Sequence, residues 1–334
     1  MKKHVFDDLL SAMSNAQTTV GFTRAVPGSP EIQGVCIKTI GDTNASREDL
    51  LGFVSGLDAL VTMYTDPVDD GLLDAAGEQL KIICNFAVGF DNIDISACKN
   101  RGIIVCNTPD AVTEGTANLA WLLIMASARK LIQADQYARS ETYPANGHLG
   151  MNEFLGMDLC NKNLLIVGAG RIGYATALRA KAFGMRILYT ARSRHLNFEM
   201  APLGATRVDL EKGLSQADVV SIHTPFTPQT HHLINRDNLK LLKSTAILVN
   251  TSRGPVVDEA ALVDVLKAGK LWGAGLDVYE NEPVVHPGLL ELNNVVLTPH
   301  IGSAEIAWRQ AMTDMVLTNI KAVLAGQEPP NRIA

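Results

Sequence analysis

The stretch Leu164-Leu165-Ile166-Val167-Gly168-Ala169-Gly170-Arg171-Ile172-Gly173 decides the fold of this chain. Four apolar residues give way at once to glycines spaced G-x-G-x-x-G, and residues 175–178 continue as a helix. In a strand–turn–helix unit Gly168 permits the turn, Gly170 lets a diphosphate approach bare backbone, and Gly173 lets the helix pack close to the sheet. The N–H groups at the start of the helix attract the anion. The context predicts dinucleotide binding rather than an ordinary glycine-rich turn.

The end of the next strand, predicted at residues 185–190, indicates which dinucleotide is used. An NAD-binding chain places an acid there for the ribose 2′-hydroxyl, about 20 residues after the glycines. This sequence has Ala191, followed by Arg192, Ser193 and Arg194. Two guanidiniums can pair with a 2′-phosphate, and no carboxylate stands at that place to repel it. A solvated basic loop is the alternative. The missing acid together with the added cations favours NADP(H), with NAD(H) possible.

Composition limits the class of protein. A chain of 334 residues that is 47% hydrophobic can bury a large core, and its length suggests two domains. The net charge of −6 and the pI near 5.8 argue against a nucleic-acid partner. The five cysteines never form a C-x-x-C pair, so we expect a reducing compartment and no metal site. The sequence shows no signal peptide, and residues 119–128 are too few to span a bilayer. We therefore expect a cytoplasmic protein without membrane contacts.

Strands and helices alternate along the first part of the chain. Residues 1–16 suggest a short amphipathic helix or a frayed tail. Strands are predicted at 18–23, 59–63, 80–85 and 103–106, with helices at 47–54 and 69–76. This alternation indicates a parallel sheet covered by helices. A long helix is predicted from Thr113, as its cap, to about residue 131, followed by a loop over 143–158.

Two features follow predicted strand ends, where parallel sheets bind ligands. Gly89, in the segment 86–94, lets successive backbone N–H groups face a crevice and receive a carboxylate. Strands at 247–250, 274–278 and 295–297 are followed by Arg253, Glu282 and His300. Each of these three residues has an ordinary structural explanation, but together on one sheet edge they predict a site. His231 and His232 follow a further strand at 217–223 without adjacent carboxylates, so we expect solvated imidazoles rather than a metal site.

Five motifs, in order and at matching spacing, resemble the D-isomer-specific 2-hydroxyacid dehydrogenases over nearly the whole chain after residue 17. They are Val88-Gly89-Phe90-Asp91-Asn92-Ile93-Asp94, the glycine turn at 168–173, Asn250-Thr251-Ser252-Arg253-Gly254, Gly275-Leu276-Asp277-Val278 with Glu282-Pro283, and Pro299-His300-Ile301-Gly302-Ser303. Within that family the sequence is most similar to the glyoxylate/hydroxypyruvate reductases, whose second cofactor strand also ends in basic residues.

The resemblance implies an α/β fold of two doubly wound parallel-sheet, Rossmann-like domains separated by a cleft. The substrate-binding domain is expected at 1–107 plus 299–334, and the dinucleotide-binding domain at 108–298. A closing helix over about 304–326 returns to the first domain. Members are usually homodimers. The family's dimer-arm loop often carries Trp, whereas residues 140–148 here carry none, which leaves the choice of substrate open.

The resemblance also implies roles for individual residues. Arg253 grips the substrate, His300 donates a proton to the forming alkoxide, and Glu282 orients the imidazole. The substrate is expected to contact Val88, Gly89, Arg253, His300, Ser303, Met63 and Tyr64. The expected cofactor contacts include the glycine turn and the basic loop. They are Thr116, Gly168, Gly170, Arg171, Ile172, Gly173, Arg192, Ser193, Arg194, Thr224, Pro225, Thr230, Thr251, Ser252, Arg253, Asp277, His300 and Gly302.

The expected reaction is reduction of a small 2-oxo acid, glyoxylate first and hydroxypyruvate second, by NADPH. One alternative is another D-2-hydroxyacid dehydrogenase with a different substrate. A second alternative, from another class, is a dinucleotide-sensing corepressor-type scaffold with the same fold. That scaffold is disfavoured because the sequence shows no long disordered tail.

Overall fold

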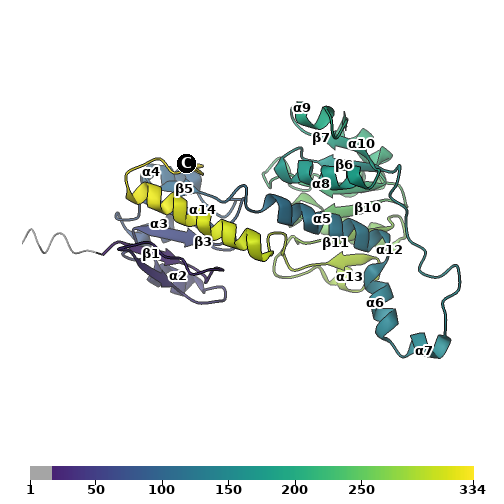
Figure 1. Ribbon diagram of the computed structural model, residues 1–334, viewed down its shortest axis with the longest axis horizontal. Helices are drawn as coiled ribbons and strands as arrows, with labels where there is room; N and C mark the ends of the chain where they lie inside the picture. The colour runs from purple at the N-terminus through teal and green to yellow at the C-terminus, as the bar shows by residue number, and fades with distance from the viewer. Residues whose placement is uncertain (1–16) are drawn as a thin grey trace, which may run out of the picture. The chain divides into compact units, whose positions relative to one another are not determined.

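The computed structural model describes residues 17–334, so the N-terminal helix predicted over 1–16 lies outside the described residues. The chain divides into two compact units. Unit 1 contains the described residues up to Val112 together with Glu305–Ala334, and unit 2 is Thr113–Ala304. The sequence places the corresponding crossings near residues 107 and 299. Each unit is built on its own sheet (Figure 1).

Unit 1 contains a five-stranded sheet in the order β2-β1-β3-β4-β5, with every pair parallel. Its strands are β1 (Thr19–Phe22), β2 (Cys36–Thr39), β3 (Ala59–Thr62), β4 (Ile82–Asn85) and β5 (Ile104–Cys106). Its helices are α2 (Arg47–Phe53), α3 (Asp70–Ala76), α4 (Ile95–Asn100) and α14 (Ile306–Leu324). Ser46, Asp69 and Asp94 cap α2, α3 and α4 by accepting backbone N–H groups, which fixes where these short helices begin.

Both faces of this sheet are covered. Buried apolar residues of α2, α3 and α4 form one core with alternate residues of the central strands, such as Leu60 and Ile83. On the other face α14, drawn in yellow, lies along the sheet beside β4 (Figure 1). The carbonyl of Val316 in that helix accepts a weak bond from the thiol of Cys84 in β4. The last residues of the chain add to β5, since Ile333 donates to Val105 and Val105 donates to Ala334.

Unit 2 contains a seven-stranded, all-parallel sheet in the order β12-β11-β10-β9-β6-β7-β8. Its strands are β6 (Asn163–Val167), β7 (Arg186–Thr190), β8 (Thr206–Arg207), β9 (Val219–Ile222), β10 (Ile247–Asn250), β11 (Gly273–Leu276) and β12 (Val295–Leu297). Its helices are α5 (Thr113–Ala128), α6 (Leu131–Arg139), α7 (Thr142–Asn146), α8 (Arg171–Ala182), α9 (Leu196–Glu199), α10 (Leu210–Gln216), α11 (Arg236–Lys240), α12 (Glu259–Lys267) and α13 (Pro287–Leu290), with a 3-10 turn at Gly254–Val256.

The strand quoted at the outset shows why unit 2 is doubly wound. Leu164 and Ile166 point into a core shared with α5, α8 and α9, whereas Leu165 and Val167 point into a core shared with α10, α11 and α12. Because successive side chains of a strand alternate between faces, a continuous apolar run requires a layer of helices on each face. The expectation of two Rossmann-like parallel-sheet units is confirmed.

Three local predictions are wrong. The helix starting at Thr113 ends at Ala128, because Lys130 adopts a left-handed conformation with φ of 52° before α6 begins. The expected loop over 143–158 overlaps α7, so α6 and α7 form an arm that extends from the sheet of unit 2 (Figure 1). Thr113 does not act as a cap: it is the first helical residue, and its buried hydroxyl has no hydrogen-bond partner. Within residues 17–334, helices long and apolar enough to cross a membrane are absent.

Candidate active site

The glycine turn after β6 has the geometry that the sequence predicts. Gly168 has φ of +104°, and a Cβ there would lie 2.8 Å from the backbone of His223. A Cβ on Gly173 would lie 2.4 Å from the carbonyl oxygen of Gly168, so this glycine allows α8 to approach the strand. At Gly170, the residue before α8, a Cβ would meet no atom within 4 Å. The open backbone at the N-terminus of α8 therefore fits a diphosphate.

Other predicted cofactor contacts differ in how much hydrogen-bonding capacity they retain. Thr224, after β9, and Thr251, after β10, each have a buried hydroxyl with no hydrogen-bond partner. Buried hydroxyls are normally paired, so these two groups suit a bound ligand. By contrast, the hydroxyl of Thr230 is used within its own turn, where it donates to the carbonyl of Pro225 and accepts the N–H of Thr227. Ser252 donates to Asn250. The hydroxyls of Thr224 and Thr251 are therefore the groups in this set that fit a bound dinucleotide.

The carboxylate of Asp277, at the end of β11, holds the segment that carries His300. One oxygen accepts the hydroxyl of Thr298 at 2.6 Å and the N–H of Ile301 at 2.8 Å, and the other accepts the N–H of Gly302 at 2.9 Å. Asp277 is only 1% exposed, and this burial raises the pKa of its carboxyl against the opposing effect of the three donors. Asp277 thus fixes the backbone on both sides of Ile301.

Thr116 and Asp277 both lie close to Gly302. A Cβ added to Gly302 would lie 3.2 Å from the hydroxyl of Thr116 and 3.3 Å from the carboxylate of Asp277. The structure therefore brings together three of the residues predicted to contact the cofactor. Ser303 follows directly and is partly exposed.

His300 and Glu282 form a pair. The Nδ1 atom of His300 lies 2.8 Å from Oε2 of Glu282, and the other carboxylate oxygen accepts the N–H of Tyr279 at 3.1 Å. His300 has φ of 55°, and its N–H donates to the carbonyl of Asp277. The two residues come from loops after β12 and β11, which are neighbours in the sheet. A carboxylate on Nδ1 orients the ring so that Nε2 points toward a reactant, which is the arrangement of an acid–base histidine.

Arg253 follows β10, the next strand along. Its guanidinium donates to the carbonyl of Ser252 at 2.9 Å, and the side chain of Asn250 donates to the carbonyl of Arg253 itself. A Cβ on Gly254 would lie 1.9 Å from the carbonyl group of Tyr279 and 2.4 Å from the nitrogen of Glu280. Only a glycine allows this approach, so the loop bearing Arg253 packs directly against the loop bearing Glu282.

A second cluster, missed at the sequence level, supports these two loops. His232 does not lie free in solvent as expected, because its Nε2 lies 2.7 Å from Oε1 of Glu280, 48 positions later in the chain. Glu280 and Glu259 exchange bonds, each accepting the backbone N–H of the other at 3.2 and 2.8 Å. Burial, opposed by the backbone N–H of Glu280 and assisted by the nearby carboxylates of Glu280 and Glu282, raises the pKa of Glu259 to about 7. His232 also donates from its backbone to Pro255.

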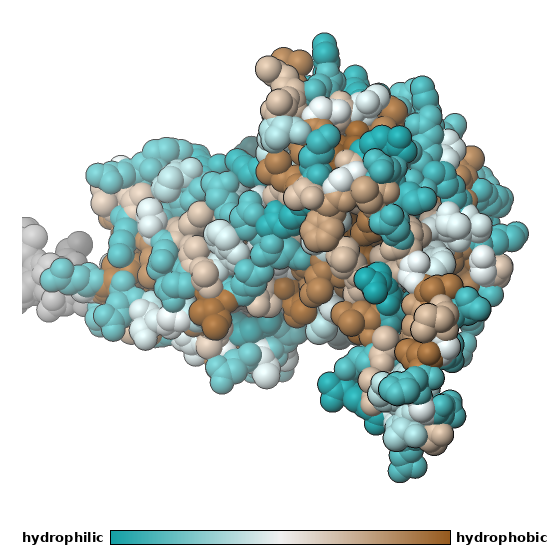
Figure 2. Space-filling model, turned by 45° about the vertical axis from the view of Figure 1, so that its right-hand side comes forward, coloured by the Kyte–Doolittle hydropathy of each residue, from teal (hydrophilic) through white to brown (hydrophobic). Residues whose placement is uncertain are grey.

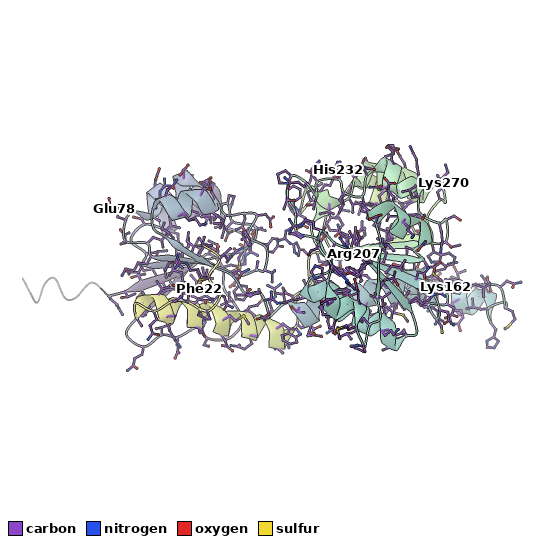
Figure 3. All side chains as sticks on the ribbon, turned by 90° about the horizontal axis from the view of Figure 1, so that it is seen from above. Phe22, Glu78, Lys162, Arg207, His232 and Lys270 are labelled. Carbon is purple, nitrogen blue, oxygen red and sulfur yellow. The ribbon has the colours of Figure 1, made fainter. Side chains whose placement is uncertain are left out.

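Figure 3 labels His232 in this region of unit 2. One signal for the cluster was present in the sequence: Glu280 lies two positions before Glu282 in the same strand-end loop. Its pairing with His232 could not be read from spacing, because it depends on how the segment after β9 packs beside β10 and β11.

The basic loop after β7 is less simple than the sequence suggests. Arg194 is not available as an unpaired cation, because both its Nε and one terminal nitrogen lie within 2.7 Å of Oε2 of Glu199. Ala191 does stand where an NAD-binding chain carries an acid, but α9 brings the carboxylate of Glu199 to the same loop. Arg192 and Ser193 are exposed. Arg207, labelled in Figure 3, donates to the carbonyls of Ala191 and Arg192 from the neighbouring strand β8.

The remaining candidates belong to unit 1. Val88 and Gly89 follow β4, and their carbonyls accept the side-chain amides of Asn107 and Asn85 at 2.8 and 2.7 Å. Among the described residues, the N–H groups of Val88 and Gly89 donate to no partner, as expected for a carboxylate receptor. Met63 is buried, and Tyr64 is partly exposed at the end of β3.

Comparison with known proteins agrees with this architecture. Residues 121–302 match the family model described as D-isomer specific 2-hydroxyacid dehydrogenase, NAD binding domain. A glyoxylate reductase from Thermococcus onnurineus is 48% identical over 291 residues, which is 86% of each chain. The chain belongs to the D-isomer specific 2-hydroxyacid dehydrogenase family. The family expected from the five motifs is thereby confirmed, and with it a nicotinamide-dependent oxidoreductase that acts between 2-oxo and 2-hydroxy acids.

Solved structures extend the similarity of this dehydrogenase to almost its full length. A glyoxylate reductase from Paecilomyes thermophila is 31% identical with a TM-score of 0.84, covering 95% of this chain and 98% of that one. An NADPH-dependent glyoxylate/hydroxypyruvate reductase from Sinorhizobium meliloti, in complex with NADP and malonate, is 33% identical with a TM-score of 0.82, covering 96% and 97%.

Proposed function

We propose that the chain reduces a small 2-oxo acid to the 2-hydroxy acid, with glyoxylate as the first substrate and hydroxypyruvate as the second, and with NADPH as the preferred reductant. The observation that carries the proposal is the 2.8 Å contact between His300 Nδ1 and Glu282, on a loop packed against the one that bears Arg253. The names of the relatives from Thermococcus onnurineus and Sinorhizobium meliloti support the choice of substrate and reductant.

In this mechanism Arg253 binds the carboxylate of the substrate through its planar fork of donors. When bound, the nicotinamide supplies the hydride that reaches the carbonyl carbon. Nε2 of His300 donates its proton to the carbonyl oxygen as negative charge develops there, so a C–H and an O–H bond form as the C=O double bond becomes single. Glu282 holds the ring by Nδ1, which leaves Nε2 directed at the carbonyl oxygen.

The other proposed substrate contacts lie at the ends of β3 and β4 and beside His300. The free backbone N–H groups of Val88 and Gly89 receive the second carboxylate oxygen. Met63, Tyr64 and Ser303 are the remaining proposed substrate contacts. Thr116, Asp277 and Gly302 hold the nicotinamide end of the cofactor, while residues 168–173 hold its diphosphate.

We also propose a homodimer. Apolar side chains are exposed on the α6–α7 arm and near the end of α5, and Figure 2 shows brown atoms on that lobe of a mostly hydrophilic surface. Met151 is 89% exposed, and Leu155 and Leu122 are also exposed. A hollow of about 470 Å³ lies between the end of α5 and the loop after α7. Exposed apolar surface of this kind is typical of an association site, and light scattering tests it.

The proposed cytoplasmic location is supported by the cysteines. All five lie within the described residues and are free thiols. Cys84 and Cys106 are register partners on the neighbouring strands β4 and β5, and both are free thiols rather than a disulfide. Free thiols that lie side by side are compatible with a reducing compartment.

The test of the proposed reaction compares initial rates with glyoxylate, using NADPH and NADH at matched concentrations. The variant is His300→Asn, because asparagine tolerates the left-handed backbone at this position better than alanine does. We expect turnover to fall by about 10²–10⁴-fold, the range for positioned acid–base groups, while cofactor binding persists. The control is Glu211→Gln, an exposed residue of α10 away from the proposed site and arm. Turnover of His300→Asn near that of the wild type would refute the role of His300.

A further inference from the structure

The carboxylate of Glu199 lies among the residues expected to read the cofactor's 2′-phosphate, and the proposed reaction gives it no role. It contacts Arg194 through two donor atoms, Nε at 2.7 Å and a terminal nitrogen at 2.6 Å. Arg194 is one of the two guanidiniums that the sequence offers to a 2′-phosphate. The acid that an NAD-binding chain carries at the strand end is replaced here by an acid on the following helix.

The position of Glu199 is fixed from the core side. Its Oε1 atom accepts the hydroxyl of Tyr189 at 2.8 Å, and that hydroxyl accepts the backbone N–H of His195 at 3.0 Å. Tyr189 is fully buried in β7. The ring of Phe198, the residue before Glu199, packs on Tyr189 and is also buried. Glu199 therefore cannot swing away from the end of β7 when a ligand arrives, unlike an acid on a free loop.

The charge of Glu199 is also fixed. Bonds from Arg194 and then from the hydroxyl of Tyr189 hold the pKa of Glu199 below its usual value, so it is ionised at neutral pH. On the other side, Arg207 holds the backbone of the loop through the carbonyls of Ala191 and Arg192. Within this loop, Arg194 is therefore paired with an acid, whereas Arg192 and Ser193 are not.

We propose that Glu199 is a specificity-determining positioning residue that opposes the 2′-phosphate: it holds Arg194 in an ion pair, so that NADP(H) is favoured less strongly than the basic loop alone would allow and NAD(H) remains usable. This inference rests on the proposed role of the basic loop in cofactor binding. It assigns Arg192 and Ser193 as the unopposed phosphate contacts, with Arg194 shared between Glu199 and the ligand.

The size of the effect follows from Coulomb's law. Once Glu199 is neutral, Arg194 is released from the ion pair and can turn toward the phosphate. Two unit charges about 6 Å apart in water attract by roughly 330/(80 × 6) kcal/mol, and a phosphate near neutral pH carries almost two charges. Converted at about 1.4 kcal/mol per factor of ten, removal of the Glu199 charge strengthens binding of a 2′-phosphate by about tenfold. A ligand without that phosphate gains little. Because the groups are near the surface, added salt reduces the difference.

The test compares Glu199→Gln with the wild-type chain. Glutamine keeps an oxygen that can accept from Tyr189 and removes the charge. The matched control is Glu211→Gln, which removes one exposed carboxylate from α10 of the same unit. The probes are adenosine 2′,5′-bisphosphate and adenosine 5′-monophosphate as inhibitors competitive with the cofactor, together with kcat/KM for NADPH and NADH.

We expect Glu199→Gln to lower the inhibition constant of the bisphosphate about tenfold, with that of the monophosphate changed less than twofold. The ratio of kcat/KM for NADPH over NADH should rise by a similar factor and shrink at about 0.5 M salt. In an Arg194→Gln background, the gain in bisphosphate affinity from Glu199→Gln should fall to a few-fold or less. This double-mutant cycle isolates the part of the effect that depends on the ion pair between Glu199 and Arg194. Glu211→Gln should change none of these ratios.

Three results overturn the inference: unchanged or weaker bisphosphate binding in Glu199→Gln, an equal gain for both nucleotides, or a full gain in the Arg194→Gln background. If Glu199→Gln fails to fold, Arg192→Gln and Arg194→Gln are compared instead: bisphosphate binding should weaken less in Arg194→Gln, because Glu199 already holds that guanidinium, and an equal or larger loss there overturns the inference. A wild-type preference for NADH would refute the cofactor proposal alone, since the change in bisphosphate binding is measured separately from that preference.

Discussion

Replacement of Asp277 by asparagine tests whether this carboxylate fixes the position of His300, the proposed proton donor. The carboxylate accepts three hydrogen bonds: from the hydroxyl of Thr298 and the N–H of Ile301 on one oxygen, and from the N–H of Gly302 on the other. An asparagine amide has one acceptor and one donor. If its NH₂ group faces Gly302, one bond is lost and two donors oppose each other; if it faces Ile301, two bonds are lost.

The less costly orientation therefore loses one hydrogen bond to a charged acceptor, worth about 1.5–3 kcal/mol. If that energy no longer holds the segment around His300, turnover falls about ten- to a hundredfold. Global stability should change less, because asparagine also removes the cost of burying a charge, a cost that is evident in the raised pKa of Asp277.

The assay measures kcat and the KM for the cofactor in Asp277→Asn, alongside thermal unfolding. Thr298→Val is the matched control, since it removes one partner and leaves the carboxylate with its two backbone bonds; we expect its kcat within a few-fold of the wild type. A loss confined to kcat identifies a positioning role, whereas a loss confined to the cofactor KM identifies a cofactor ligand. Full activity in Asp277→Asn would refute the reasoning.

Two further predictions concern the support of the same loops. Gly254→Ala places a Cβ 1.9 Å from the carbonyl of Tyr279, so we expect it to reduce the free energy of unfolding by about 1–3 kcal/mol and to lower kcat. Denaturant unfolding and initial rates measure both effects. The control is Gly52→Ala, because a Cβ on Gly52 meets no atom within 4 Å. The pKa of Glu259, which is 3% exposed, is raised from 4.5 to about 7. A raised pKa gives stability that is complete below about pH 4.5 and is lost as pH rises through 7, by up to about 3 kcal/mol. Glu259→Gln should therefore gain stability relative to the wild type between pH 5 and pH 8; an unchanged difference in Tm across that range would contradict the shift.

The sequence predicted those parts of the molecule that depend on local rules. Gly168 needs a positive φ and Gly173 needs the space of a missing Cβ, and the structure shows both requirements, whereas Gly170 leaves open space before α8. Strand ends were also predictable, because the apolar runs are short and are bounded by turn residues. Parallel strands then place Glu282 and His300 on one edge, where they pair at 2.8 Å.

Contacts made between distant segments were not predictable in this way. The pairing of His232 with Glu280 and the return of Glu199 to the end of β7 both depend on how loops pack beside the sheet. An argument that examines only the residues next to a strand end finds no acid near Arg194, although one lies five positions later on a helix. The break between α5 and α6 was missed because a lysine in a left-handed conformation has no strong sequence signal.

The order of segments along the chain bears on how the protein folds. Unit 2 is continuous, whereas the sheet of unit 1 needs α14 and the strand-like residues after it, which pair with β5. During synthesis the apolar face of β4 therefore emerges well before Met312, Val316 and Ile320 are available to cover it. Unit 2 can therefore complete its core before unit 1 does. Until α14 is synthesised, the N-terminal part of unit 1 keeps an apolar face of its sheet exposed. That interval is when the nascent chain is most exposed to aggregation and to chaperone binding.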